Sequence, residues 1–303
     1  MTTPGTATAP VQTYPLGTRV AVEALGSFFV VFAGLATALF NSSGSASTVG
    51  FAYGLALLAV IVAFGHISGG YFNPAFSLGM AVAGRIKWLA AVLYMVAQAV
   101  GGMIAAVVIY ALIKVLPAGS TPAISKLFGS LANGFDSHSP SQVPMVGVLI
   151  VDVVATAVIV GIILAATSAR NKTVLAPIAI GLAFAVAVTV TMPLSNGSLN
   201  PARSIAVVFL ADSWALGQLW LFWLAPLFGA ALAAAIYRSF QPAVHAVVEL
   251  DDAVAADAET PAVEEAEDDG ALPKPVPAAK SHQVSESGAG KDDAQEFFDK
   301  PQK

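Results

Sequence analysis

Six long runs of apolar residues dominate the hydropathy pattern of this chain. They cover about residues 20–40, 50–65, 88–113, 145–166, 174–192 and 218–237. Most are close to the roughly 20 residues that a helix needs to cross the ~30 Å hydrocarbon core of a bilayer. The first run is too long for the apolar part of a signal peptide, and five similar runs follow it. The pattern therefore predicts an all-α membrane protein with six transmembrane helices.

Two further apolar runs, residues 74–84 and 201–211, are only eleven residues long. As helices they would extend about 16 Å, roughly half of the hydrocarbon core. The order of two long runs, one short run and one long run occurs twice. Because each half holds three full spans, the second half must run inverted in the membrane. We therefore expect the two half-membrane re-entrant helices to enter from opposite faces and to meet at their N-terminal ends.

The same tripeptide, Asn-Pro-Ala, stands at the beginning of both short runs. An asparagine cap followed by proline suits the first turn of a helix, where the missing proline N–H is not needed. The meeting helix ends and the two amides would put partial positive charge and hydrogen-bond donors at the centre of the membrane. The residues of this predicted pore centre are Asn73, Pro74, Ala75, Asn200, Pro201 and Ala202.

Charge separates the apolar region from the C-terminal end. The chain has 56% apolar and 11% charged residues, and its net charge of −5 is the sum of +5 over residues 1–242 and −10 over residues 243–303. We expect a disordered N-terminus over residues 1–17, a membrane domain over residues 18–242 and an acidic, disordered tail over residues 243–303. The inverted repeats of the membrane domain cover about residues 19–113 and 145–237.

Basic residues give the expected orientation through the positive-inside rule. The long connector, with Lys114 and Lys126, is the exception. If the chain crosses the membrane six times, the other basic residues flanking the spans fall on one side, which would place both termini in the cytoplasm. These residues are Arg19, Arg85, Lys87, Arg170, Lys172 and Arg238. The segment 114–144, rich in Gly, Ser and Pro, is expected to be a long external connector.

The sequences around the two motifs resemble a known family. The segment 65–70 reads GHISGG, and the segment 200–204 reads NPARS. Together with the paired Asn-Pro-Ala motif, they are similar to the signature loops of the major intrinsic proteins, the aquaporins and glycerol facilitators. The similarity covers about residues 19–237, and the pair Phe222-Trp223 is closer to the aquaporin branch. The resemblance implies an aquaporin-like channel domain that forms homotetramers with one pore in each subunit.

The resemblance also implies a selectivity filter on the external side of the pore centre. Its four positions fall at Tyr53, Val188, Gly197 and Arg203. Members that select strictly for water usually have Phe and His at the first two positions, so Val188 should make the constriction wider and less polar. Glycerol facilitators usually place Asp after the arginine, where this chain has Ser204. The filter thus departs from both patterns.

Three further polar residues are singled out within the apolar runs. Glu23 and Asp152 are the only acids in the six spans, 50 and 48 residues before the motif asparagines. By resemblance they brace the re-entrant loops, although a proton-relay role is an alternative and Asp152 is shorter than the usual Glu. By resemblance, His66 lines the pore on the cytoplasmic side. A packed histidine is the alternative, and no second ligand lies at metal-binding spacing.

These patterns predict a passive channel for water with a relaxed filter, which excludes ions and protons and also admits small neutral solutes. A glycerol-conducting, aquaglyceroporin-type channel is the alternative. A coupled secondary transporter is a further one, although it would need titratable groups at the midplane beyond the two expected braces. We expect a multi-pass protein of the cell membrane in contact with lipid. No enzyme activity, cofactor, metal or nucleic-acid partner is expected.

Overall fold

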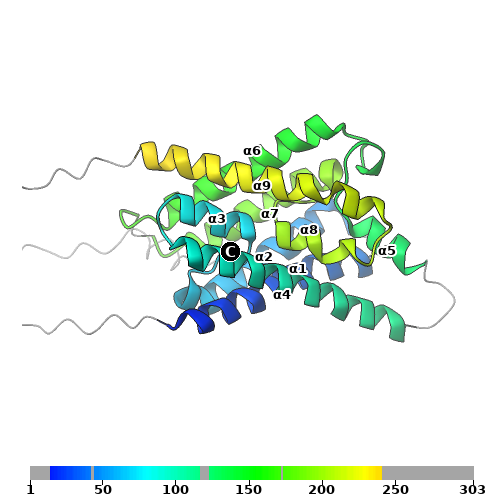
Figure 1. The fold of residues 1–303 in the computed structure, drawn as a ribbon, viewed down its shortest axis with the longest axis horizontal. Helices are drawn as coiled ribbons and strands as arrows, with labels where there is room; N and C mark the ends of the chain where they lie inside the picture. Colours follow the sequence, from blue (N-terminus) through cyan, green and yellow to red (C-terminus); the bar gives the residue numbers. More distant parts are fainter. Residues whose placement is uncertain (1–13, 42–43, 117–122, 172, 241–303) are drawn as a thin grey trace, which may run out of the picture. The chain divides into compact units, whose positions relative to one another are not determined.

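The computed structural model describes residues 14–41, 44–116, 123–171 and 173–240 (Figure 1). Within these ranges the chain forms nine α-helices and one short 3-10 helix, and it contains no strand. The elements are α1 (Leu16–Phe40), α2 (Ala46–Ser68), α3 (Pro74–Val82), α4 (Trp88–Val115), α5 (Ile124–Leu131), η1 (Asp136–His138), α6 (Met145–Ala166), α7 (Ala176–Ser195), α8 (Pro201–Val208) and α9 (Trp214–Ser239).

Most of the two expected disordered ends lies outside the described residues. The expected tail, residues 243–303, does so entirely. At the N-terminus α1 already begins at Leu16, so the membrane domain starts two residues earlier than expected.

Six of the helices are long and apolar enough to cross a membrane: α1, α2, α4, α6, α7 and α9. Each corresponds to one predicted run, and the observed ends lie within four residues of the predicted ones. Large apolar side chains such as Leu55, Val154 and Phe228 are exposed along them. Such extensive apolar exposure fits a surface that faces lipid rather than water.

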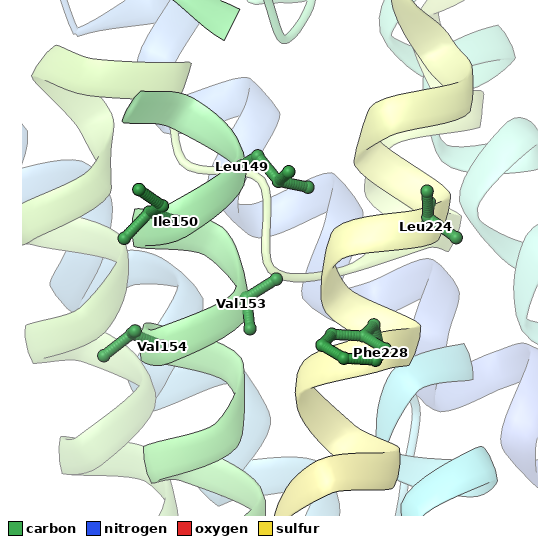
Figure 2. A pocket seen from close by; sticks show the side chains of 6 residues that line it. All are labelled: Leu149, Ile150, Val153, Val154, Leu224 and Phe228. Atoms are coloured by element: carbon green, nitrogen blue, oxygen red, sulfur yellow. The ribbon is translucent and has the colours of Figure 1, made fainter. Parts of the chain in front are cut away.

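This exposed apolar surface includes a groove between α6 and α9 (Figure 2). Its volume is about 450 Å³, and its lining consists of Leu149, Ile150, Val153, Val154, Leu224 and Phe228. A groove with only aliphatic and aromatic side chains offers no hydrogen bond to a polar solute. This groove is therefore part of the apolar surface and not a polar site.

The two short helices end at opposite faces of the protein. Arg85, just after α3, donates to the carbonyl oxygens of Leu164 and Thr167 at the end of α6, at 3.3 and 3.0 Å. Asp212, just after α8, instead pairs with Lys126 of α5, which precedes α6 in the chain. We call the face where α1 begins and α6 and α9 end the terminal face, and the other the connector face. The inversion predicted for the second half is thus present.

Helix packing repeats in the two halves. Helix α1 packs on α4 and α6 packs on α9, while each short helix contacts the long helix of the other half, α3 on α9 and α8 on α4. Equivalent glycines allow the close approaches. A Cβ atom on Gly101 would overlap the carbonyl oxygen of Ala24, and one on Gly229 would overlap that of Val153. The small residues therefore hold the helix pairs within each half at backbone contact.

The segment between α4 and α6, expected only as a long external connector, contains a helix in its described part. It contains α5, whose Phe128 and Leu131 are buried against the membrane domain. Ile124, Phe128 and Leu131 follow the i, i+4, i+7 spacing of an amphipathic helix, which is a pattern visible in the sequence. Lys126 on the exposed side forms a 3.0 Å ion pair with Asp212. The connector is therefore a folded cover over part of the connector face.

Candidate functional site

The first turns of α3 and α8 meet through their motif asparagines. Asn73 caps α3, and its Oδ1 accepts from the Ala75 N–H at 2.9 Å. Asn200 caps α8, and its Oδ1 accepts from the Ala202 N–H at 2.9 Å. The amide nitrogen of Asn73 donates to the carbonyl oxygen of Leu199 at 3.0 Å, which joins the two motifs directly. Pro74 and Pro201 occupy the first helical positions and are buried, as are both alanines.

The amide nitrogen of Asn200 differs from that of Asn73. It is buried and has no hydrogen-bond partner among the residues that the structure describes. A buried amide donor normally has a protein or water partner. It lies at the N-terminal end of α8, where the helix dipole is positive. This position is suited to hold the oxygen atom of a small polar molecule.

The loops that lead into the two motifs follow the same backbone path. Left-handed φ angles occur at equivalent positions, at Gly70 and Gly197 with 71° and 64°, and at Phe72 and Leu199 with 51° and 58°. A φ near +60° suits glycine but is unusual for phenylalanine or leucine. Surrounding contacts must therefore hold both loops in place.

Glu23 supports the first loop from α1. Its Oε1 accepts from the Ser68 hydroxyl at 2.6 Å and the Tyr71 N–H at 3.1 Å. Its Oε2 accepts from the Phe72 N–H at 2.6 Å and from the side chain of Gln98 at 2.7 Å. The carboxylate is fully buried and takes up four donors. Glu23 thus links α1 and Gln98 of α4 to the loop before Asn73.

Asp152 is the equivalent residue in α6 and makes fewer contacts. Its Oδ1 accepts from the Ser195 hydroxyl at 2.9 Å. Its Oδ2 has no hydrogen-bond partner within the described part of the chain, and neither does the nearby buried hydroxyl of Ser198. In contrast to Glu23, Asp152 accepts no backbone N–H group from the loop that it faces.

The second loop is held instead from the connector. The side-chain nitrogen of Asn133 donates to the carbonyl oxygens of Ser195 and Asn196 at 2.9 and 3.0 Å. The side-chain nitrogen of Asn196 donates in turn to those of Ser130 and Ala132 at 2.8 and 2.9 Å. Asn133 is buried, although it belongs to a segment between the membrane spans. The folded connector thus supports this loop through carbonyl oxygens and the Asn196 side chain, whereas Glu23 supports the first loop through N–H groups.

Arg203 lies on the first turn of α8 with 2% of its surface exposed. Its guanidinium donates to Oδ1 of Asn133 at 2.7 Å and to the carbonyl oxygen of Asn196 at 2.8 Å. Its Nε has no partner among the residues described by the structure. A buried guanidinium at membrane depth normally faces a polar cavity or partner. Two of its nitrogen atoms are therefore fixed by the protein, while Nε is available for a further acceptor.

The structure brings the four expected filter residues together. A Cβ atom on Gly197 would lie 3.2 Å from Cγ1 of Val188, so these two residues are in contact. Arg203 is close enough to the Tyr53 hydroxyl to act on it electrostatically. That hydroxyl is buried and has no hydrogen-bond partner in the described ranges. Val188 with Gly197 and Tyr53 with Arg203 are thus two neighbouring pairs, and Tyr53 and Val188 belong to one buried cluster.

His66 lies apart from these groups, near the end of α2. Its side chain is exposed, and its ring contacts that of Tyr14 edge-on with a centroid distance of 6.0 Å. A cavity of about 230 Å³ on the terminal side is lined by its neighbours Gly65 and Gly69. Among the described residues no three His, Cys, Asp or Glu side chains are grouped to hold a metal.

Comparison with known proteins relates this geometry to a family. Residues 11–237 match the family model described as Major intrinsic protein. The chain belongs to this family. An Aquaporin Z of Photorhabdus laumondii is 37% identical to this major intrinsic protein over 225 residues, covering 73% of this chain and 96% of its own. An Aquaporin Z of Bradyrhizobium diazoefficiens is 38% identical over 225 residues, covering 73% and 92%.

A solved structure agrees with the fold. The X-ray structure of the aquaglyceroporin from Plasmodium falciparum matches with a TM-score of 0.63, over 75% of this chain and 97% of that one. Its sequence identity is 20%, so the likeness concerns the fold alone. The predicted family and the predicted six-helix fold with two re-entrant helices are both confirmed. This major intrinsic protein is a multi-pass membrane channel and not an enzyme.

Two residues that position the site were not predicted. Gln98 on α4 bridges Glu23 and the Ser77 hydroxyl, which lies 2.8 Å from its side-chain nitrogen. A single amide within an apolar span is a signal that could have revealed it. Asn133 has no such local signal, because its partners Ser195 and Arg203 are more than 60 residues away in the chain.

Proposed function

We propose that this protein is a passive channel for water, with a filter wide enough to admit small neutral solutes. The proposal rests on three buried polar atoms, Asn200 Nδ2, the Tyr53 hydroxyl and Arg203 Nε, which make no hydrogen bond of good geometry in the described part of the chain, although the Tyr53 hydroxyl interacts with Arg203. A buried polar group without a partner costs about 1–3 kcal/mol. Passing water molecules would remove this cost at each atom. The two relatives named Aquaporin Z support water as the solute.

Exclusion of ions and protons follows from the charges around Asn73 and Asn200. The N-terminal ends of α3 and α8 both carry partial positive charge there. Half-helix dipoles and an arginine are the established electrostatic barrier in aquaporin-type pores. A hydrated proton or metal cation would have to approach both helix ends and Arg203. A water molecule that accepts a hydrogen bond from the Asn200 amide would also be oriented by it. In this orientation it interrupts the continuous chain of hydrogen bonds along which a proton could move.

The relaxed filter is proposed because neither Val188 nor Gly197 has a polar side chain. Val188 has no hydrogen-bonding group, and Gly197 offers only its backbone. Its φ of 64° favours glycine at this position. Both residues leave the solute fewer polar contacts than a histidine would. We propose Tyr53, Val188, Gly197 and Arg203 as the filter, with Glu23 and Asp152 as loop braces.

An aquaglyceroporin-type channel is the second candidate. The apolar Val188 and the absence of a side chain at Gly197 favour it, because glycerol needs more room than water. Ser204 after the arginine, in place of the aspartate usual in glycerol facilitators, favours water. Permeability to glycerol relative to water decides between the two.

We also propose the cell membrane as the location, with both chain ends in the cytoplasm. Arg85 and Arg238 both act at the terminal face, where they donate to backbone carbonyls at helix ends. The positive-inside rule assigns such a face to the cytoplasm. A homotetramer with one pore per subunit is proposed from family resemblance, with lipid around it. The pore-lining role of His66 remains a proposal as well, and its exposed position gives it no direct support.

The test is stopped-flow light scattering on proteoliposomes under an osmotic gradient of sucrose and then of glycerol. Proteoliposomes should shrink several-fold faster than empty vesicles in sucrose, and their glycerol uptake should also exceed the background. Val188→His should reduce glycerol uptake more than water flux, because it narrows the filter. Shrinkage no faster than in empty vesicles, with folded protein present, would refute the water channel.

A further inference from the structure

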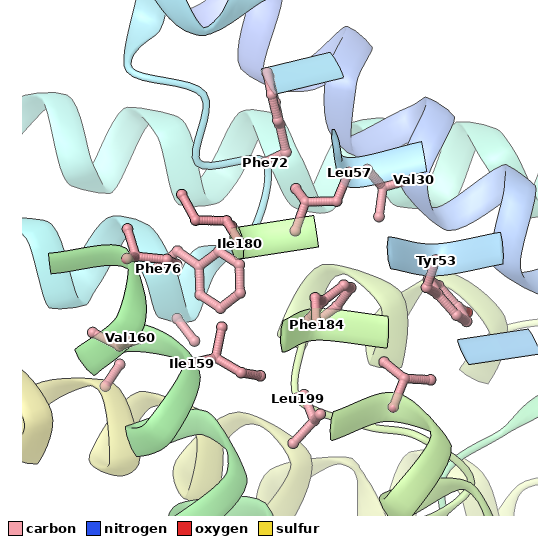
Figure 3. Packing of buried hydrophobic residues seen from close by; sticks show 14 of the residues in the cluster. Val30, Tyr53, Leu57, Phe72, Phe76, Ile159, Val160, Ile180, Phe184 and Leu199 are labelled. Carbon is pink, nitrogen blue, oxygen red and sulfur yellow. The ribbon is translucent and has the colours of Figure 1, made fainter. Parts of the chain in front are cut away.

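Three aromatic rings run from the expected filter towards the terminal face (Figure 3). Tyr53 of α2 contacts Phe184 of α7 edge-to-face, with a centroid distance of 6.3 Å. Phe184 contacts Phe76 of α3 in the same way at 5.8 Å. At these distances the rings are in van der Waals contact, so nothing can pass between them. Phe76 and Phe184 are each 1% exposed.

Phe76 lies next to the pore centre. It is the third residue of α3 and follows Asn73-Pro74-Ala75 directly. It also lines the 230 Å³ cavity that includes Gly65, Gly69 and Thr167 on the terminal side. One side of the ring therefore faces this cavity while another contacts Phe184. A solute that travels between the cavity and the two asparagines must pass beside Phe76.

The surroundings of this passage are apolar. Ile163 and Ile180 line the same cavity, and Ile159 belongs to the same buried cluster as Phe76 and Phe184. Water in an apolar segment gives up hydrogen bonds that no side chain replaces. Hydrophobic constrictions in channels control flow by this loss of water. The two rings also limit the diameter that a solute can have.

From this arrangement we infer that Phe76 and Phe184 form a second, apolar constriction, separate from the expected filter at Val188 and Gly197. This inference rests on the proposed channel function. The constriction limits water flux and slows neutral solutes larger than water more strongly than it slows water. Solute selectivity then depends on two places, the expected filter and the second constriction. A solute that passes Tyr53 next meets the ring of Phe76 on its way to the terminal face.

The first test replaces Phe76 by valine and compares water and glycerol flux in proteoliposomes. Phe76→Val should raise glycerol permeability at least threefold and water flux by a smaller factor. Phe128→Val is the matched control, because Phe128 is equally buried but packs α5 on the membrane domain in another cluster. It should leave the ratio of glycerol to water permeability unchanged. The inference is wrong if Phe76→Val leaves this ratio at the wild-type value.

The second test uses the absence of cysteine from the chain. A Phe76→Cys variant carries one thiol, which a small mercurial reagent can reach only through the conducting path. The reagent should reduce water flux of this variant severalfold and leave Phe128→Cys and the wild type unchanged. If Phe76→Cys conducts water and the reagent has no effect, Phe76 does not line the path.

The channel function and the second constriction are tested separately. If wild-type protein does not conduct water, the proposed function is wrong. If the wild type conducts water but both Phe76 variants behave like their controls, only the second constriction is wrong.

Discussion

The two loops that carry the Asn-Pro-Ala motifs share a backbone path but are supported in different ways. The first loop is held from within the membrane domain, by the three hydrogen bonds that Glu23 accepts from Ser68, Tyr71 and Phe72. The second receives one hydrogen bond from Asp152 through Ser195, and the connector holds it through Asn133 and Asn196. The same geometry can thus be maintained by a single buried acid or by a folded cover.

The largest expected effect is loss of the first brace. In Glu23→Gln, an NH2 group replaces one of the two carboxylate oxygens. Each of these oxygens accepts two hydrogen bonds, so two donors lose their acceptor. Removing one partner of a buried charged network costs on the order of 3 kcal/mol or more. Thermal unfolding in detergent should show a large fall in Tm. Asp152→Asn is the control and should lower Tm far less. Equal shifts in the two variants would contradict the difference between the loops.

The next effect concerns Asn133. Asn133→Ala removes the acceptor of the Arg203 guanidinium and the donor to Ser195 and Asn196. The buried guanidinium then lacks one partner, which should cost about 2 kcal/mol and let the side chain move. Stopped-flow assays should show reduced water flux. Asn171→Ala, at an exposed position on the terminal face, is the control. Wild-type flux and Tm in Asn133→Ala would mean that the connector does not support the second loop.

A third substitution lengthens the weaker brace. Asp152→Glu adds one methylene group and should bring a carboxylate oxygen towards the loop N–H groups of Ser198 and Leu199, as Glu23 reaches those of Tyr71 and Phe72. One or two new buried hydrogen bonds should stabilise the protein by about 1 kcal/mol. A modest rise in Tm checks this. A fall in Tm would show that the second loop has no room for the longer acid.

The smallest effect is a pH dependence at the connector face. The hydrogen bond from Lys126 lowers the pKa of Asp212 below its ordinary value. The folded state therefore binds this proton less readily than the unfolded state. The resulting stabilisation is present above about pH 4 and is lost as the pH falls through the lowered pKa. Asp212→Asn should make Tm slightly less sensitive to acid in this range. An unchanged acid dependence would show that the ion pair contributes nothing.

Prediction from sequence succeeded where the pattern is local. The six spans follow from apolar length alone, and the short runs after Asn73 and Asn200 follow from length and motif. Their helices, with nine and eight residues, are shorter than the eleven predicted, because apolar residues continue past the last helical turn. The helix α5 was not predicted within the Gly-, Ser- and Pro-rich connector, although Ile124, Phe128 and Leu131 follow a helical spacing.

Tertiary contacts between distant residues could not be predicted. Asn133 binds Arg203, 70 residues away, and neither its type nor its neighbours indicate a buried position. Phe76 and Phe184 look like ordinary apolar residues of two separate helices. Only folding brings their rings together beside the expected pore centre.

The sequence by itself determined that this chain crosses a membrane six times, contains two inverted repeats and belongs with the major intrinsic proteins. Those properties depend on run length, repeat order and a short motif, all of which are local. The tertiary structure decided how each loop is supported and which side chains stand along the expected path. Those properties depend on hydrogen bonds and ring contacts between residues far apart in the chain, whose partners become known only once the helices are packed.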